Sequence, residues 1–232
     1  HLTVSLVVRK RGLYTGKGSS VAGKVICNDL NIPSKFFHPT NTHLLQLHEC
    51  LSEFPERDKN AHKTEFGHVL VVGGEYGMGG AVIMAAEAAF RAGAGLVSVA
   101  TRDRHALALL LRQPEIMAHG ISCDAEIDPL IERATHVVLG PGLGKSEWSR
   151  WLFAKLVSSG KKGVIDADAL NILSESPTDC HDWVLTPHAA EAARLLNGDQ
   201  DMNRFSTLTR LHKKFGGVIV LKGSGSLITD GE

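Results

Sequence analysis

The sequence has few of the residues that mark secreted, metal-binding or membrane proteins. Its four cysteines, Cys27, Cys50, Cys123 and Cys180, form no CxxC pair and no zinc-finger spacing. We interpret them as reduced, mostly buried and inert cysteines of a cytoplasmic protein. The 12 histidines contain no HxxxH or HExxH motif, so no structural metal site is expected.

An excess of one charge and long hydrophobic runs are absent as well. The 25 Lys and Arg residues balance the 25 Asp and Glu residues, which gives no overall electrostatic case for nucleic acid or an anionic membrane. Glu87 and Arg91 interrupt the longest apolar run, 81–92, well short of the roughly 18 residues that span a bilayer. The sequence therefore predicts a soluble protein with neither a nucleic-acid nor a membrane partner.

What the sequence does contain is an alternation of short apolar runs with helical patterns. We expect strands at 68–72, 96–100, 115–118, 136–139, 163–165, 183–185 and 218–221. Helical patterns lie between them at 80–92, 104–111, 126–133, 147–157, 188–196 and 203–215. This alternation is typical of a parallel sheet covered on both faces, so the predicted fold class is α/β.

The composition divides the chain into three parts. Residues 1–38 hold an alternating strand at 2–8 and a Gly-rich stretch. Residues 39–61 hold one amphipathic helical pattern and a polar linker, where we place a domain junction. Residues 62–232 hold the α/β pattern. Its helix at 80–92 is apolar almost all round, so we expect it to be buried.

Glycine, aspartate, histidine or lysine follows five of the expected strands. The five segments are 73–80, 140–144, 166–171, 186–188 and 222–226. Because ligands bind beyond the carboxyl ends of strands in an open parallel sheet, these segments should form one composite site. Lys222 with the amides of 223–226 would bind phosphate, Asp166 and Asp168 would suit Mg²⁺ or sugar hydroxyls, and His188 would hydrogen-bond a ligand.

Each segment also has an ordinary structural explanation. A Gly-rich turn after a strand is often only tight backbone geometry, and an aspartate at a strand end is often a helix N-cap. Two familiar phosphate-binding motifs do not fit, since GxxxxGK would need glycine at Leu139 and the glycines of 73–80 do not follow GxGxxG. The joint occurrence of five such segments favours a functional site.

The segments resemble the NAD(P)H-hydrate dehydratase family in order, spacing and strand-end placement over residues 62–232. The matching stretches are GGEYGMGGA (73–81), RAGAGLVSVAT (91–101), PEIM (114–117), GPGLG (140–144), DADALN (166–171), LTPHAAEAARLL (185–196) and VLKGSGS (220–226). Residues 1–38 resemble more weakly the end of the NAD(P)H-hydrate epimerase domain that precedes the dehydratase in bifunctional proteins. The resemblance implies a ribokinase-like fold with a mostly parallel central sheet and helices on both faces.

The resemblance also implies a repair reaction on a damaged cofactor. The family dehydrates the (S) form of hydrated NADH or NADPH, with ADP or ATP and Mg²⁺, through a phosphorylated intermediate. The residues expected to contact the hydrated dinucleotide are Ala81, Gly144 and His188. Those expected to hold the ADP phosphates are Lys222, Gly223, Ser224, Gly225 and Ser226. Supporting residues would be Gly80, Gly142, Asp168 and Asn171, and a homo-oligomer is expected.

The sequence departs from the family pattern in three places. Residues 189–190 are Ala-Ala where Pro-Gly is usual, and residues 224–226 are Ser-Gly-Ser where Ala-Gly-Thr is usual. The catalytic Asp of the family lies in a downstream segment, so it is expected beyond Glu232. Since the sequence starts at His1 and its 230–231 hairpin dipeptide lacks a return strand, we expect truncation at both ends.

Two other functions stay open. A kinase of the same superfold would phosphorylate a small alcohol, but the long match over 73–226 favours the dehydratase. A nucleotide-binding or assembly module without catalysis is the second alternative.

Overall fold

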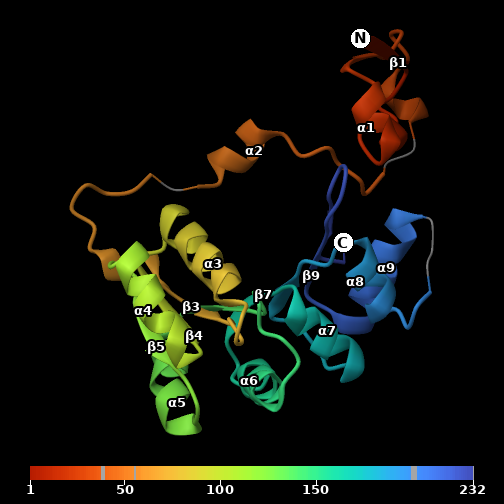
Figure 1. The fold of residues 1–232 in the computed structure, drawn as a ribbon. Coiled ribbons are helices and arrows are strands. Elements are labelled where there is room, and N and C mark those ends of the chain that lie inside the picture. Colours follow the sequence, from red (N-terminus) through yellow and green to blue (C-terminus); the bar gives the residue numbers. More distant parts are fainter. Residues whose placement is uncertain (38–39, 55, 200–202, 232) are drawn as a thin grey trace. The chain divides into compact units, whose positions relative to one another are not determined.

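The computed structural model describes residues 1–37, 40–54, 56–199 and 203–231, which form two compact units (Figure 1). The first unit contains the described residues of 1–61 together with 223–226. The second contains those of 62–222 together with 227–231.

The first unit is built on a two-stranded parallel sheet. Strand β1 (Leu2–Leu6) pairs with β2 (Lys24–Asn28), and the Gly-rich stretch between them includes a short helix, α1 (Lys17–Val21). In β1 the Ser5 side chain is buried, whereas the apolar side chains of this strand, Leu2, Val4 and Leu6, are exposed. The single-turn 3₁₀ helices of this unit are η1 (Arg11–Leu13) and η2 (Ser34–Phe36).

The amphipathic pattern of 39–61 forms a shorter helix than its apolar spacing suggests. Helix α2 (Leu47–Ser52) has six residues and begins at a capping box in which the Gln46 amide donates to Glu49 at 3.1 Å. The apolar side chains of the pattern are all exposed: Leu44, Leu45, Leu47, Leu51 and Phe54.

The second unit is an eight-stranded sheet in the order β10-β9-β8-β7-β6-β3-β4-β5. Its strands are β3 (His68–Val72), β4 (Leu96–Thr101), β5 (Met117–Gly120), β6 (His136–Leu139), β7 (Lys162–Ile165), β8 (Trp183–Leu185), β9 (Val218–Leu221) and β10 (Leu227–Thr229). All neighbouring pairs are parallel except β9 and β10, which form an antiparallel hairpin. The strand expected at 115–118 starts two residues later because Gln113 to Ile116 form a turn, with an amide-to-carbonyl bond of 3.1 Å.

The helices alternate with these strands as predicted, with one addition. They are α3 (Gly79–Arg91), α4 (Asp103–Arg112), α5 (Asp124–Arg133), α6 (Glu147–Val157), α7 (Asp168–Glu175), α8 (Ala189–Leu195) and α9 (Arg204–Phe215), with the 3₁₀ turn η3 (Lys63–Phe66) before β3. No helix was predicted at 168–175, where α7 lies.

Two hydrophobic clusters cover the two faces of the sheet. Leu70 and Val72 of β3 belong to the larger cluster, with side chains of α5, α6, α7, α8 and α9. Val71, which points to the opposite face, belongs to the second cluster with side chains of α3 and α4. The α/β prediction, with a mostly parallel sheet and helices on both faces, is confirmed. No helix in the described part of the chain has the length and hydropathy to cross a bilayer.

Helix α3 is only partly buried, against the prediction. Val82 and Ala86 face the sheet, but Met84 is 65% exposed. Glu87 is buried instead of lying on an exposed charged seam, because Arg112 at the end of α4 binds its carboxylate. The apolar composition of α3 therefore does not predict how much of the helix is buried.

The cysteine prediction is right about free thiols and wrong about burial. All four are free thiols, but only Cys180 is buried, while Cys27 and Cys123 are exposed and Cys50 is intermediate. Burial, with a contribution from the Asp179 charge, raises the pKa of the Cys180 thiol to about 12, which makes this residue inert.

Candidate functional site

The site lies at the point where the strand order reverses. The chain runs from β3 to β4 and β5 on one side and then returns to β6 on the other side of β3. The connections that leave β3 and β6 therefore start side by side at the carboxyl edge and lead to helices on opposite faces of the sheet. Open α/β sheets bind ligands at this kind of position. The predicted segments 73–80 and 140–144 leave from these two strands.

These two Gly-rich segments cross in direct contact. The Gly74 amide donates to the Pro141 carbonyl at 3.0 Å, and the Glu75 amide donates to the Gly142 carbonyl at 2.7 Å. A Cβ atom at Gly142 would lie 3.1 Å from Cβ of Ala81, so these two predicted residues are neighbours. The crossing brings small residues together at the start of α3, where backbone can approach a ligand closely.

Asp168 fixes the end of the second segment. Its Oδ2 accepts the Gly144 amide at 2.9 Å, and its Oδ1 accepts the Asn171 side-chain amide at 3.3 Å. Asp168 also starts α7, and the preceding Ala167 has φ 49° and ψ −121°. A positive φ at alanine costs about 1 to 3 kcal/mol, so the turn that presents Asp168 is strained. One carboxylate oxygen of Asp168 therefore holds Gly144, and the other is itself held by Asn171.

Asp166, Thr186 and Lys222 form a second cluster at the ends of β7, β8 and β9. Lys222 Nζ donates to Asp166 Oδ1 at 2.6 Å, and the Thr186 hydroxyl donates to the same oxygen at 2.8 Å. The Lys222 amide also donates to the Pro187 carbonyl at 2.8 Å. Burial works to raise the pKa of Asp166, but the hydrogen bonds from Lys222 and Thr186 outweigh it and lower the pKa. The predicted phosphate-binding lysine is thus held by a carboxylate.

The residues after Lys222 make their contacts in the first unit. The Gly16 amide donates to the Ser224 carbonyl at 2.9 Å, and the Ser224 hydroxyl donates to the Gly16 carbonyl at 3.0 Å. Gly225 has φ 67°, a conformation that favours glycine. The role of 223–226 as a phosphate cradle stays a prediction.

His188 is the N-cap of α8. Its Nδ1 accepts the amides of Ala190 at 3.1 Å and Glu191 at 3.4 Å, while the Glu191 carboxylate accepts the His188 amide at 2.8 Å. This arrangement is a capping box, and it places the proton of the neutral ring on Nε2. The side chain is 51% exposed, but its Nε2 lies 3.5 Å from Oε1 of Glu191, so a ligand would share this nitrogen with the carboxylate. The sequence analysis assigned His188 a ligand contact and missed the capping role.

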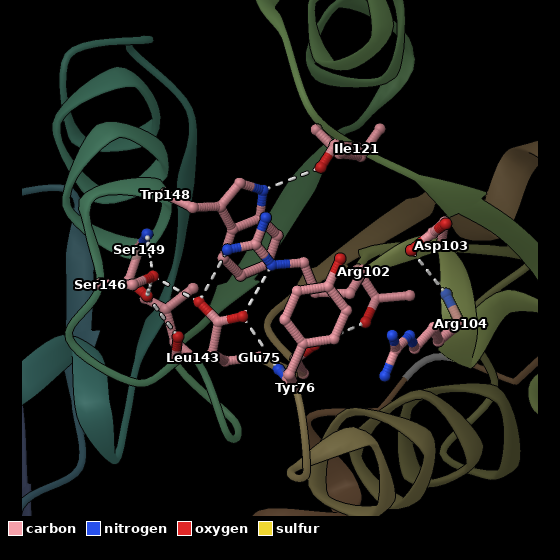
Figure 2. A network of polar contacts seen from close by, with 12 residues as sticks. Glu75, Tyr76, Arg102, Asp103, Arg104, Ile121, Leu143, Ser146, Trp148 and Ser149 are labelled. Atoms are coloured by element: carbon pink, nitrogen blue, oxygen red, sulfur yellow. Dashed lines mark hydrogen bonds and ion pairs between the residues drawn. The ribbon is translucent and has the colours of Figure 1, made fainter.

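A network that the sequence analysis did not predict lies beside the crossing (Figure 2). Arg102, which follows β4, donates two hydrogen bonds to the Glu75 carboxylate, at 2.7 and 2.9 Å. Its guanidinium lies 4.2 Å from the Trp148 ring centre and 4.8 Å from that of Tyr76. The hydroxyl of Ser146, the N-cap of α6, donates to the same carboxylate. The signal available in the sequence was a charged residue within three positions of the end of each of two strands, Glu75 after β3 and Arg102 after β4.

The hydrogen bonds to Glu75 lower its pKa. Those from Arg102 contribute most and outweigh the burial that would raise it, and those from Ser146 and the Tyr76 amide add to them. The resulting pKa is about 2, below the ordinary value of 4.5. Glu75 is therefore ionised throughout the neutral range.

We expect the stability of the protein to reflect this shift. Because the pKa is depressed, the Glu75 carboxylate stabilises the folded state above pH 4.5, and this contribution is lost as the pH falls toward about 2. The loss in free energy of unfolding should be about 3 kcal/mol. Urea unfolding across this acidic range should show a smaller pH dependence in Glu75→Gln than in the parent protein. Equal slopes in the two proteins would contradict the assignment.

Two cavities lie away from the predicted residues. One of about 480 Å³ is lined by His181, His212 and Lys213, near the amino ends of β8 and β9. The other, of about 560 Å³, is lined by Phe153, Ile172 and other residues of α6, α7 and their following loops. No predicted site residue lines either cavity. Among the described residues, no group of three or more His, Cys, Asp or Glu side chains could hold a metal ion.

Comparison with known proteins decides the family. The family model described as NAD(P)H-hydrate dehydratase matches residues 69–232. The chain belongs to the NAD(P)H-hydrate dehydratase family. The resemblance recognised in the sequence is therefore confirmed.

Two curated relatives and one solved structure are similar to this chain over most of its length. A bifunctional NAD(P)H-hydrate repair enzyme from Coxiella burnetii is 47% identical, over 99% of this chain and 48% of its own length. An ADP-dependent (S)-NAD(P)H-hydrate dehydratase from Streptococcus thermophilus is 35% identical, over 75% of this chain and 66% of its own length. The crystal structure of a ribokinase-like superfamily protein from Enterococcus faecalis matches with a TM-score of 0.70 and 29% identity, over 75% of this chain and 63% of that one.

The ribokinase-like fold of this dehydratase-family chain is thus confirmed. The chain spans about half the length of the Coxiella burnetii relative. The structure brings Ala81, Gly142, Gly144 and Asp168 together at the crossing. His188 and Lys222 lie on the far side of β7, at the ends of the neighbouring strands β8 and β9.

Proposed function

We propose that this chain is part of an enzyme that carries out the dehydratase reaction of nicotinamide nucleotide repair, and that it supplies most of the substrate and nucleotide sites. The (S)-hydrate of NADH or NADPH binds at the crossing of 73–80 and 140–144, and ADP or ATP transfers a phosphoryl group to the hydroxyl of the hydrated ring. Elimination of phosphate then restores the reduced ring, and AMP is the second product when ADP is the donor. The contact between two Gly-rich segments at the switch point, in a member of this family, is the observation that supports the proposal.

The chain's own residues bind and orient the two substrates. The small residues Ala81, Gly142 and Gly144 let the two segments pack closely at the edge where the ring and ribose bind, with Asp168 and Asn171 holding Gly144 in place. The Lys222 ammonium neutralises phosphate charge, with 223–226 continuing the nucleotide site. Catalysis of phosphoryl transfer depends mainly on positioning the substrates and neutralising phosphate charge. The small residues of the two segments and Lys222 serve these two purposes. The general base is proposed to be an Asp outside residues 1–232.

Magnesium belongs to the proposal as a companion of the nucleotide. Mg²⁺ is usually bound by one or two carboxylates together with substrate phosphates, so a cluster of three acidic side chains is not required. Asp166 lies beside Lys222 and supplies a carboxylate at this edge. Once bound, the metal would neutralise charge on the transferred phosphoryl group.

The wider protein context is part of the same proposal. We place the enzyme in the cytoplasm as a homo-oligomer, and assign residues 1–38 to the end of an epimerase-like domain. The bifunctional name of the Coxiella burnetii relative, which matches 99% of this chain, supports the assignment of residues 1–38. Sedimentation of the natural full-length protein and an assay of (R) to (S) interconversion test these assignments.

The test of the function is the recovery of reduced-cofactor absorbance from purified (S)-hydrates. The natural full-length protein should restore NADH or NADPH when ADP or ATP is added, with release of phosphate. A phosphorylated small alcohol without any reduced cofactor would identify a kinase. Binding of nucleotide with neither product would indicate a module without catalysis.

We expect substitutions at His188 to separate its two roles. His188→Ala removes both the ring and the N-cap, so it should cost about 1 kcal/mol of stability and weaken binding of the hydrate. His188→Asn keeps a capping acceptor and should weaken binding at nearly parental stability. Calorimetry of binding and thermal unfolding measure the two effects. Parental affinity in His188→Asn would restrict His188 to its capping role.

A further inference from the structure

The Glu75 carboxylate joins three strand ends that are distant in sequence. Glu75 follows β3, Arg102 follows β4, and Ser146 lies between β6 and α6. Its partners are the Arg102 guanidinium, the Ser146 hydroxyl and the Tyr76 amide, the last at 2.9 Å. One side chain therefore links both Gly-rich segments of the crossing to the neighbouring strand.

The position of Arg102 is itself fixed from several sides. Its side chain is 19% exposed and lies between the rings of Tyr76 and Trp148 (Figure 2). The Trp148 indole N–H donates to the Ile121 carbonyl at 2.8 Å, which holds that ring in place. A planar guanidinium with two parallel hydrogen bonds and a ring stack has a defined orientation that an ammonium lacks. The ion pair is therefore a rigid unit.

This rigid unit touches the substrate-binding crossing directly. The same Glu75 donates its amide to the Gly142 carbonyl at 2.7 Å. A Cβ atom at Gly144 would lie 3.2 Å from both Cβ and Cγ of Glu75, so the Glu75 side chain packs against this glycine. A shift of Glu75 must move Gly142 or Gly144. Their partner Ala81 is part of the same crossing, since it lies against Gly142.

Stability alone does not account for the placement of this pair. Taking a carboxylate and a guanidinium out of water is costly, and an apolar pair of similar volume is often no less stable. A comparable pair, Glu87 with Arg112, joins α3 to α4 away from the strand ends. The distinguishing feature of Glu75 and Arg102 is their contact with the glycines of the crossing.

We propose that Glu75 and Arg102 are positioning residues that set the geometry of the dinucleotide site by holding the 73–80 segment against 140–144. This inference rests on the proposed function, because it takes the crossing as the substrate site. Neither residue is assigned a contact with the reacting atoms. A displacement of about 1 Å in such a site is sufficient to cost a large factor in rate or binding.

The experiment compares Glu75→Gln and Arg102→Lys with the matched control Glu87→Gln in the natural full-length protein. Glu75→Gln and Arg102→Lys should raise KM for the hydrate about tenfold, while the Kd for ADP stays within about twofold. Glu87→Gln should lower the melting temperature and leave KM unchanged. An unchanged KM in Glu75→Gln, or an equal rise in Glu87→Gln, would overturn the proposal.

A second measurement does not depend on catalysis. Amide hydrogen exchange at residue 75, whose N–H is bonded to the Gly142 carbonyl, and at Gly144 should be faster in Glu75→Gln than in the parent, and unchanged in Glu87→Gln. If Glu75→Gln does not fold, Arg102→Lys serves for the same measurement because it keeps the charge and loses the forked geometry and the ring stack. Parental exchange rates in a folded variant refute the positioning role. Failure of the parent protein to dehydrate the hydrate refutes the proposed function instead and leaves the exchange result to decide the positioning.

Discussion

Gly140→Ala should destabilise the protein by about 4 kcal/mol or more and abolish the proposed dinucleotide site. A Cβ atom at Gly140 would lie 1.8 Å from the Asp166 carbonyl oxygen and 2.9 Å from Cβ of Ala169. Gly140 also has φ 127°, which an L-amino acid rarely adopts. Since the obstruction is backbone rather than a flexible side chain, the two strand ends must move apart.

The consequences of this movement would reach both halves of the site. Gly140 donates its amide to Val72 at 3.0 Å and accepts the Leu143 amide at 3.0 Å, so it fixes the start of the 140–144 segment. Asp166 carries the hydrogen bond from Lys222. Displacement of either strand end would therefore disturb the substrate and nucleotide regions together.

The matched control is Gly160→Ala. Gly160 also has a positive φ, 69°, but no atom lies within 4 Å of the position a Cβ would take. Its substitution should cost only about 1 to 2 kcal/mol, the conformational penalty alone. Urea unfolding of both variants measures the difference, and equal losses would show that the close approach at Gly140 carries no cost.

The strands and the strand-end segments were predictable because they depend on local sequence. The runs 68–72, 136–139, 183–185 and 218–221 are apolar, short and bounded by polar or glycine residues, and the structure has strands at the same bounds. Parallel pairing then places their carboxyl ends on one edge without further information. The contact between Ala81 and Gly142 follows from that placement.

Contacts between distant charged side chains were not predictable from local patterns. Glu75 and Arg102 lie 27 residues apart, and no periodicity links them. Their pairing depends on β3 and β4 being neighbours in register, which only the folded sheet supplies. Helix α7 was missed for a different reason, because its eight residues begin at an aspartate motif whose binding chemistry suggested a loop. The exposure of Cys27 and Cys123 likewise depends on packing, which composition does not encode.

Lys222→Ala should weaken ADP binding about 10- to 150-fold, the effect of losing a charged hydrogen bond worth about 1.5 to 3 kcal/mol. Lys222 follows β9 and its side chain is 40% exposed at the carboxyl edge, where a phosphate can reach it. Its hydrogen bond to Asp166 orients it toward the end of β7. We therefore expect Asp166→Asn, which removes the competing carboxylate charge, to bind ADP at least as tightly as the parent protein in the absence of magnesium.

The matched control for Lys222→Ala is Lys162→Ala. Lys162 also pairs with an aspartate, Asp182, at 3.7 Å, but it lies at the start of β7 on the amino edge of the sheet. Lys162→Ala changes the net charge of the protein by the same amount as Lys222→Ala. Any effect of net charge on the affinity for ADP is therefore common to both variants. Calorimetric titration with ADP should show weakened binding only in Lys222→Ala. Equal affinities in Lys222→Ala, Lys162→Ala and the parent would move the phosphate site away from β9, because a lysine that touches phosphate cannot be removed without cost.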